Sequence, residues 1–306
     1  MKPVSPDGLH ATITTLCGEA GLPEPLVREP IRIWPLSAVE RVRFPDRTTA
    51  ICKHARPPFT GEATVLQAAA RAGLPVPRLL AHRVTDDRLV MLLEDLGDST
   101  ETPTDLHAAA ATARLHRADP TCPSLDVWDT DTLAALPETM LDAIGRLSRS
   151  GQLRAGKDIL LSLAGLARSS TRRAEGTQRP PFGLVHGEFH PTSLHRGMRG
   201  QHLIDFGMTF IGPGILDLAT WQGTRQPPDP KRLAAQLHAY VTAGGTTQIL
   251  RQRGGLAPEV WALGWHRLHS AAWLLQLTAT GSDGFDPSTT KQILRRQIST
   301  AIDLLR

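Results

Sequence analysis

The sequence is poor in the features that mark several specialised classes of protein. Its three cysteines, Cys17, Cys52 and Cys122, are widely spaced and form no CxxC pair. This argues against a disulfide framework or a structural zinc site and fits a reducing cytoplasm. No apolar run approaches the length of a transmembrane helix, and the first ten residues, MKPVSPDGLH, lack the apolar core of a secretory signal. We therefore expect a cytoplasmic protein without a membrane partner.

Concentrated positive charge is also absent. The formal net charge is +4, but lysine and arginine are dispersed and form no dense run. Because nucleic-acid binding proteins gather these residues in a patch or stripe, we expect no nucleic-acid partner. The 306 residues, 41% of them hydrophobic and 21% charged, are typical of a globular protein. This length is enough for one large domain or for two lobes with separate cores.

The expected elements divide the chain into a strand-rich part and a helical part. The first part has helices at 8–21 and 61–73 and strands at 31–34, 39–44, 49–53, 79–84 and 88–93. Later helices are expected at 104–117, 132–149, 154–170, 230–243, 258–279 and 287–305, with strands at 183–186 and 201–204 and a polar, basic linker at 169–181. We predict an α+β fold, with a β-rich N-lobe at 1–95, a mostly helical C-lobe at 96–306, and a hinge near Glu94–Gly97.

One stretch, HGEFHPTSLHRGMRGQHLIDFG, carries the residue types that phosphoryl transfer requires. This chemistry needs a carboxylate near the attacking hydroxyl, oxygen ligands for Mg²⁺, and cations on the phosphates. Kinase catalytic loops supply an acid, four residues, then Asn, and a later DFG. Here the same spacing gives Glu188, Ser193 and Asp205-Phe206-Gly207, and Asp217 follows in GILDLATW. A short strand, HLID, would deliver the Asp205 carboxylate to a strand end that faces a cleft.

The ordered set of motifs resembles the aminoglycoside phosphotransferase and choline kinase family, which is related to the protein kinases. That family has HGDxHxxN, then IDxx, then a DLA segment, and this chain has HGEFHPTSL, LIDFG and DLA in the same order. The resemblance covers roughly residues 30–280. It implies a protein-kinase-like bilobal fold and an ATP- and Mg²⁺-dependent phosphotransferase. By position, Glu188 would be the catalytic base, Ser193 and Asp205 the metal ligands, and Asp217 the residue that steadies the catalytic loop.

The resemblance also assigns nucleotide-binding residues upstream. Lys53 ends a strand and would hold the phosphates, and Glu62 opens the next helix and would be its ion-pair partner. The route through AGLPVPRLLA into LLEDLG matches the family's approach to the hinge. Backbone groups of Glu94 and Leu96 would then contact the adenine.

Three departures from the family pattern bear on activity. Glu188 replaces Asp and reaches one methylene further, so it can still accept a proton if the acceptor sits further back. Ser193 replaces Asn and offers a shorter oxygen ligand. The phosphate-covering loop reads PLSA without glycine, although backbone amides must approach a phosphate closely. We expect a poorer clamp there, served by the hydroxyl of Ser37.

Other interpretations of the same residues deserve comparison. His186, His190 and His195 suggest zinc, but Glu188 is misplaced for an HEXXH site and Pro191 interrupts any helix. Helical spacing places Trp261, Trp265 and Trp273 in a core. As a minority alternative, Trp265, His266 and His269 would line the acceptor pocket, because they lie where the family places its substrate helices.

The charge of the C-terminal part of the chain limits which class of acceptor it can bind. Basic residues outnumber acidic ones after residue 206, which argues against a polycationic acceptor. We expect an O-phosphotransferase for a hydroxyl group of a neutral or anionic small molecule or natural-product intermediate. Two alternatives stay open. One is a kinase for Ser/Thr of a precursor peptide, acting beside a partner lyase. The other is a pseudokinase that binds a partner or peptide without catalysis.

Overall fold

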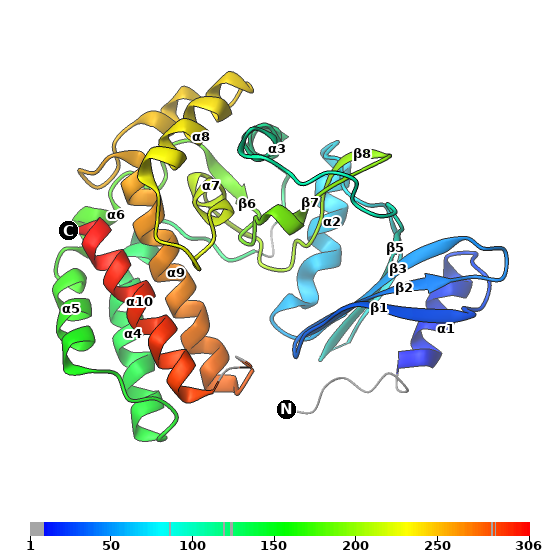
Figure 1. Ribbon diagram of the computed structural model, residues 1–306, viewed down its shortest axis with the longest axis horizontal. Coiled ribbons are helices and arrows are strands. Elements are labelled where there is room, and N and C mark those ends of the chain that lie inside the picture. Colours follow the sequence, from blue (N-terminus) through cyan, green and yellow to red (C-terminus); the bar gives the residue numbers. More distant parts are fainter. Residues whose placement is uncertain (1–8, 86, 119, 123–124, 283, 285) are drawn as a thin grey trace. The chain divides into compact units, whose positions relative to one another are not determined.

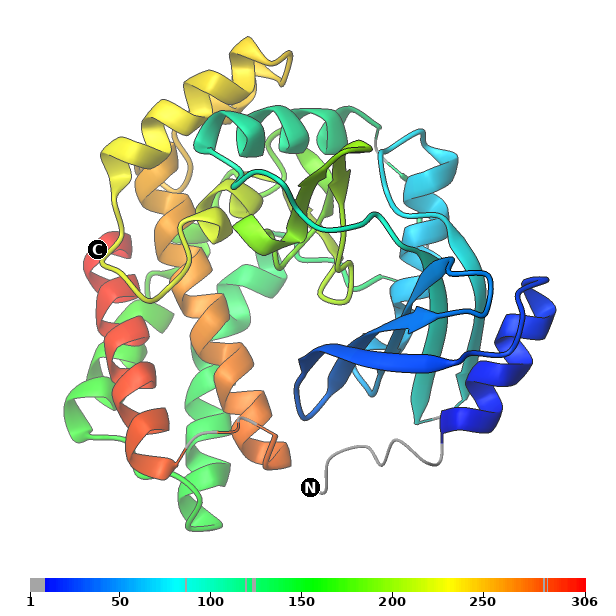
Figure 2. The ribbon, with the colours of Figure 1, turned by 45° about the vertical axis from the view of Figure 1, so that its right-hand side comes forward.

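The computed structural model describes residues 9–306 apart from 86, 119, 123–124, 283 and 285. The expectation about a secretory signal concerns residues 1–8 and thus lies outside the described residues. The chain forms two compact units (Figures 1 and 2). The N-terminal unit runs to Pro103 and takes in a short piece from Pro120 and the segment Thr192–Thr209. The C-terminal unit contains the remaining residues. The sequence placed the boundary at residue 95 and gave all later residues to the C-lobe.

The N-terminal unit is built on a five-stranded antiparallel sheet with the order β1-β2-β3-β5-β4. Its strands are β1 (Val27–Ile33), β2 (Ser37–Arg43), β3 (Thr49–Ala55), β4 (Leu79–Thr85) and β5 (Arg88–Glu94). Its helices are α1 (His10–Glu19), η2 (Phe59–Gly61) and α2 (Glu62–Arg71). The α+β fold class and both expected hairpins are confirmed.

Side chains along β3 point alternately to the two faces of the sheet, one of which packs against a helix while the other lines a cavity. Ala50 and Cys52 belong to a core cluster with Leu16 of α1, so one face is closed by that helix. Cys52 is fully buried, as its place in the strand predicted. Ile51 and Lys53 project to the opposite face, because successive strand residues point to opposite sides. Both of them line a cavity.

A further hairpin, from a segment far along the sequence, belongs to the N-terminal unit. It consists of β7 (Leu194–Gly197) and β8 (Gly200–Leu203). The amide of Leu203 donates to the carbonyl of Pro75 at 2.8 Å, and the Thr100 amide donates to the Arg196 carbonyl at 2.8 Å. The guanidinium of Arg196 also pairs with Glu101 at 2.6 Å. These contacts hold the segment before Asp205 against the N-terminal unit.

The C-terminal unit is mostly helical. Its longer helices are α3 (Asp105–Ala118), α4 (Thr130–Arg149), α5 (Lys157–Ala167), α8 (Pro230–Thr242), α9 (Pro258–Thr280) and α10 (Pro287–Leu305). Shorter elements are α6 (Ser170–Ala174), α7 (Ile215–Trp221), η4 (Thr247–Leu250) and the paired strands β6 (Phe182–Val185) and β9 (Phe210–Pro213). The turn η3 (Pro191–Ser193) spans the boundary between the units. Within the described ranges, none of the helices has the length and apolar character needed to cross a membrane.

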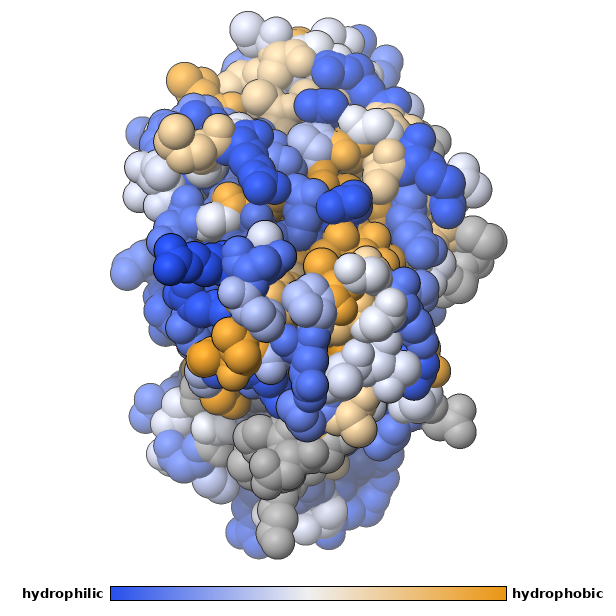
Figure 3. Space-filling view, turned by 90° about the vertical axis from the view of Figure 1, so that its right-hand side faces the viewer, coloured by the Kyte–Doolittle hydropathy of each residue, from blue (hydrophilic) through white to orange (hydrophobic). Residues whose placement is uncertain are grey.

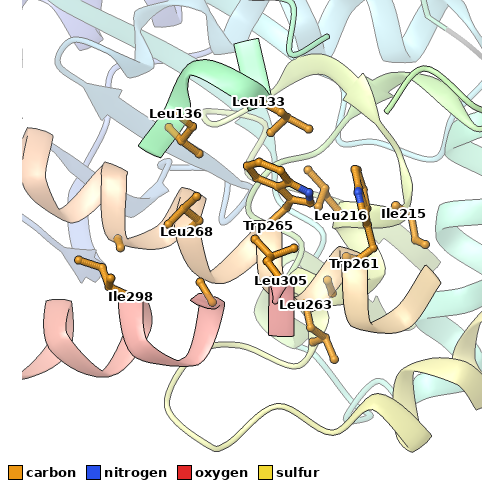
Figure 4. Packing of buried hydrophobic residues seen from close by; sticks show 14 of the residues in the cluster. Leu133, Leu136, Ile215, Leu216, Trp261, Leu263, Trp265, Leu268, Ile298 and Leu305 are labelled. Carbon is orange, nitrogen blue, oxygen red and sulfur yellow. The ribbon is translucent and has the colours of Figure 1, made fainter. Parts of the chain in front are cut away.

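The core of the C-terminal unit forms around α9. Trp261 and Trp265 are fully buried, as the helical spacing predicted, and Figure 4 shows them packed among leucines and isoleucines. Both indole N–H groups donate to the carbonyl of Arg173, at 2.7 and 3.3 Å. The stretch 169–181, which was expected to be a linker, is therefore packed against the core and begins with α6. The polar composition of this stretch did not indicate that it packs on the core, because the contact with the two tryptophans is made by a backbone carbonyl.

The surface follows the composition. Figure 3 shows a face that is mostly hydrophilic, with apolar residues gathered in smaller patches between the charged ones. The exposed apolar side chains of the N-terminal unit include Ile31 and Ile33 of β1, with exposed fractions of 55% and 66%.

Candidate active site

The N-terminal unit contains a cavity of about 410 Å³ on the free face of its sheet. Polar residues lie at two places, the hinge after β5 and the group around Lys53 and Asp205. Between them the walls are apolar, which suits a flat, mostly apolar ring system. The apolar lining residues are Ile31, Val39, Ile51, Leu66, Pro77, Leu93, Leu96 and Ile204.

Lys53, Glu62 and Asp205 form one network of charges at this cavity. The Nζ atom of Lys53 lies 2.6 Å from Oε2 of Glu62 and 2.5 Å from Oδ1 of Asp205. Side chains of Lys53 and Glu62 are almost completely buried, whereas Asp205 keeps 18% of its side-chain surface exposed. Burial alone would lower the pKa of Lys53, but the two carboxylates outweigh burial and raise it. The lysine is therefore a fixed cation beside a partly accessible carboxylate.

The backbone at Asp205 is arranged to present this carboxylate. Its φ is 71°, in the left-handed region that residues with a side chain adopt rarely and that Asp tolerates better than most. The next amide, of Phe206, donates to Oε1 of Glu62 at 3.1 Å. Phe206 itself is buried. Glu62 thus holds both Lys53 and the backbone beside Asp205, and the sequence pairing of Lys53 with Glu62 has a direct counterpart in the structure.

The hinge is organised by Asp95. Its carboxylate accepts from the Gly97 amide at 2.8 Å and pairs with Nε of Arg41 at 2.7 Å. Burial would raise the pKa of Asp95, but these hydrogen bonds and the nearby guanidinium lower it. The Glu94 amide donates to the Arg78 carbonyl at 2.9 Å. Glu94 and Leu96 both line the cavity.

Two residues that were expected at the site, Ser193 and Ser37, are not among those that line the cavity, and one that was not expected, Arg32, is. Ser193 is buried, with an exposed fraction of 2%, and its carbonyl accepts from the Ile204 amide at 3.0 Å. Ser37 is also buried and is not among the residues that line the cavity, so the contact expected from its hydroxyl has no counterpart there. Arg32 of β1 lines the cavity instead, with Nη2 3.1 Å from Oδ2 of Asp205. The strand-like pattern of residues 31–34 did not indicate that Arg32 would join the site.

The C-terminal unit holds the rest of the expected catalytic loop. Asp217 of α7 is fully buried, and its carboxylate accepts from the amides of His186 and Gly187 at 3.0 and 3.1 Å. Its Oδ2 also lies 3.3 Å from Nε2 of His116, whose Nδ1 lies 3.2 Å from the Tyr240 hydroxyl. These bonds tie Asp217 to the backbone just before Glu188. The role of steadying a catalytic loop, which the resemblance implied, stays a prediction. His116 and Tyr240 carry no sequence signal of their own.

Glu188 follows this anchored backbone directly. Its side chain is partly buried, and its carbonyl accepts from the His190 amide at 3.0 Å, which closes a tight turn. The intervening Phe189 is fully buried and packs on His186 and Trp221, with ring centroids 5.6 and 5.2 Å apart. These contacts fix the backbone of the turn, and a fixed backbone limits the directions in which the side chain of Glu188 can point.

The histidines divide between the units. His186 and His190 belong to the C-terminal unit and His195 to the N-terminal one. No group of three or more His, Cys, Asp or Glu suited to a metal ion occurs in the part of the chain that the structure describes. His269 packs edge-on against Trp128, with centroids 4.4 Å apart, and lines a groove of about 580 Å³ between α4 and α9.

Comparison with known proteins shows the family of the chain. The model of the phosphotransferase enzyme family matches residues 39–264. The chain belongs to this family. The predicted enzyme class, a phosphotransferase with an alcohol group as acceptor, is thereby confirmed, as is the resemblance found in the motifs. A comparison with curated proteins gave no match.

Solved structures share the fold at low sequence identity. A choline/ethanolamine kinase family protein from Mesorhizobium loti is 15% identical, with a TM-score of 0.67, covering 98% of this chain and 97% of that one. A macrolide 2'-phosphotransferase from Brachybacterium faecium is 15% identical, with a TM-score of 0.57 and coverages of 94% and 97%. An aminoglycoside phosphotransferase from Alicyclobacillus acidocaldarius is 15% identical, with a TM-score of 0.53 and coverages of 87% and 88%. These likenesses confirm the kinase-like fold.

Proposed function

We propose that this phosphotransferase uses ATP and Mg²⁺ and transfers the phosphoryl group to a hydroxyl of a small molecule or natural-product intermediate. The observation that carries the proposal is the Lys53–Glu62–Asp205 network at one end of an apolar-walled cavity. Buried charges are costly unless they are paired, and paired charges that face a cavity are suited to binding a charged ligand. In this assignment Lys53 holds the α- and β-phosphates, and Glu62 fixes its direction. The hinge groups of Glu94 and Leu96 receive the adenine.

The donor set around Asp205 fits Mg²⁺. This ion is usually bound by one or two carboxylates together with phosphate oxygens and waters, so a ready-made cage of three acids is not needed. Asp205 supplies the partly exposed carboxylate. Ser193, which the resemblance implied as the second oxygen ligand, is buried and is not among the residues that line the cavity, so phosphate oxygens and waters would make up most of the remaining ligands. The chemistry of the bound ion would be to neutralise charge on the transferred phosphoryl group.

Glu188 is the proposed general base, since it would accept the proton of the acceptor hydroxyl. Asp217 acts through the backbone, because it holds the amides of His186 and Gly187 just before the base. The groove of the C-terminal unit that contains Trp128 and His269 also has Trp273 and one charged residue, Arg146, in its lining. Such a lining suits a neutral or anionic, largely apolar acceptor and does not suit a polycation.

The experiment that tests the proposal separates binding from chemistry in Glu188 variants. Wild type, E188Q and E188D are assayed for ATP·Mg²⁺ affinity by calorimetry and for ATP consumption with a panel of hydroxyl compounds. We expect E188Q to bind ATP·Mg²⁺ like wild type and to lose turnover by about 10²-fold or more, with partial activity in E188D. D46N changes an exposed turn carboxylate of the N-terminal unit and is the matched control.

Two outcomes would refute the assignment. Equal turnover of E188Q and wild type would remove Glu188 from the chemistry. Nucleotide binding without any phosphoryl transfer, in wild type and across the panel, would favour the binding-module alternative.

A further inference from the structure

Two cations share the carboxylate that the proposed function assigns to the metal. Lys53 contacts Oδ1 of Asp205 at 2.5 Å, and Arg32 lies 3.1 Å from Oδ2. Lys53 is buried and held by Glu62, whereas the side chain of Arg32 is 47% exposed. One cation is therefore held in place, and the other has room to move.

The register of the sheet explains how Arg32 reaches this place. Arg32 of β1 lies opposite Val39 of β2, and Val39 lies opposite Lys53 of β3. Directly opposed residues project to the same face, so Arg32 and Lys53 share the cavity face, roughly 10 Å apart at the backbone. The pairing shifts between Pro30 and Arg32, which marks a bulge at Ile31. Because of it, the consecutive residues Ile31 and Arg32 both line the cavity, and a regular strand would send them to opposite faces.

The turn between β1 and β2 is poorly suited to bind phosphate through its backbone. Trp34, Pro35, Leu36 and Ser37 include no glycine, and the Trp34 amide donates to the Ser37 carbonyl at 2.9 Å. The Trp34 ring packs on Phe59, with centroids 5.6 Å apart. Close approach of backbone amides to a phosphate usually requires glycine. A guanidinium needs no such approach, since it reaches out on a long side chain and can bond two phosphate oxygens at once.

We propose that Arg32 is a second phosphate-binding residue, which replaces the amides of a glycine-rich loop and moves from Asp205 to the nucleotide's polyphosphate when ATP·Mg²⁺ binds. The inference rests on the proposed function. Like charges repel, so a metal ion at Asp205 disfavours the guanidinium on the same carboxylate. The phosphate oxygens then offer Arg32 another anionic acceptor within the same cavity.

Calorimetry with three ligands tests this role. ATP·Mg²⁺, ADP·Mg²⁺ and adenosine are titrated into wild type, R32A, R32Q, R32K and R43A. Arg43 is the matched control, because it has a similar exposed fraction of 48% and pairs with Glu29 at 2.7 Å outside the cavity. We expect R32A and R32Q to bind ATP·Mg²⁺ about 10- to 100-fold more weakly, with unchanged adenosine affinity. R32K should recover part of the loss, and R43A should match wild type.

The outcomes separate this inference from the proposed function. If R32A and R32Q bind ATP·Mg²⁺ as tightly as R43A, Arg32 does not hold phosphate, although the proposed function stands on wild-type binding. Tighter binding by these variants would also overturn the inference, because Arg32 would then only obstruct Asp205. If wild type has no Mg²⁺-dependent affinity for ATP, the proposed function itself fails, and the inference fails with it.

Discussion

The two units bury their charges in opposite ways. In the N-terminal unit, Lys53 bonds two carboxylates and faces a cavity. In the C-terminal unit, Arg253 is fully buried and donates to the backbone carbonyls of Gly176, Thr177, Arg179 and Pro180. Arg267 likewise donates to the carbonyls of Thr224 and Gln226. Burial lowers the pKa of both arginines to about 10.

The bonding partners of a buried charged side chain help to distinguish a functional role from a structural one. A charge whose partners are backbone carbonyls ties segments together and has no acceptor to exchange. A charge whose partners are carboxylates beside a cavity can exchange one of them for a ligand anion. This criterion predicts that the network of Lys53, Glu62 and Asp205 is functional and that Arg253 and Arg267 are structural.

The largest effect is expected from K53M. In the proposed assignment Lys53 is the main contact of the phosphates, so its removal should lower turnover by about 10²- to 10³-fold and weaken ATP affinity. Steady-state kinetics and calorimetry measure the two effects. K291M, which changes an exposed lysine of α10, is the control. Unchanged turnover in K53M would place the phosphates elsewhere.

R253M should have the reverse profile. Loss of the guanidinium removes its hydrogen bonds to four backbone carbonyls, of which that of Gly176 keeps the Arg179 amide as a donor. We expect the free energy of unfolding to fall by about 3 kcal/mol. ATP affinity, measured well below the unfolding temperature, should stay within about twofold of wild type. Urea denaturation gives the first quantity and calorimetry the second. A selective loss of ATP affinity in a stable R253M protein would break the comparison.

D217N tests a carboxylate that lies between the two classes. Asp217 bonds backbone amides, like a structural residue, but those amides belong to the turn that carries Glu188. An amide offers one acceptor oxygen instead of two, so one backbone bond is lost and the turn loosens. We expect turnover to fall by about 10- to 100-fold while ATP affinity is kept.

D105N is the matched control for this variant. Asp105 is a carboxylate of the same unit that bonds the Trp221 indole and the Arg232 guanidinium. Its replacement should lower stability and leave turnover almost unchanged. Equal turnover losses in D217N and D105N would show that Asp217 acts only through stability.

A smaller effect concerns acid stability. Burial lowers the pKa of His269 to about 4, from its ordinary value of 6.5. Between these values the unfolded chain binds a proton that the folded chain does not, so acidification favours unfolding. The contribution of neutral His269 to stability is complete above pH 6.5, decreases as the pH falls, and is lost below about pH 4. It amounts to about 3 kcal/mol.

Urea titrations between pH 7 and pH 4 measure this contribution in wild type and H269Q. The variant should lose less stability than wild type over this range. H238Q, which changes an exposed histidine of α8, is the control. Identical pH profiles of wild type and H269Q would mean that His269 is protonated as readily in the folded protein as in the unfolded one.

Local patterns in the sequence predicted much of the fold and of the site. The alternation in 39–44 and 49–53 marked β2 and β3, and the family resemblance implied the ion pair of Lys53 with Glu62 that the structure contains. The contact of Lys53 with Asp205 was not predicted. The remaining features depend on long-range contacts. Arg32 joins the site through a bulge and a cross-strand register, and His116 meets Asp217 from another helix. Neither contact leaves a periodic trace, so neither could be found from the sequence.

The most direct test of the central claim, that this altered motif is a working nucleotide site, is thermal unfolding of wild type and D205N with ATP, with and without Mg²⁺. A ligand at 100 times its Kd stabilises the folded state by about 2.7 kcal/mol, which raises Tm measurably. We predict that Mg²⁺ increases the ATP-induced rise in wild type and that D205N loses this increase, while D46N keeps it. An equal Mg²⁺-dependent rise in D205N, or no response to ATP in wild type, would contradict the account.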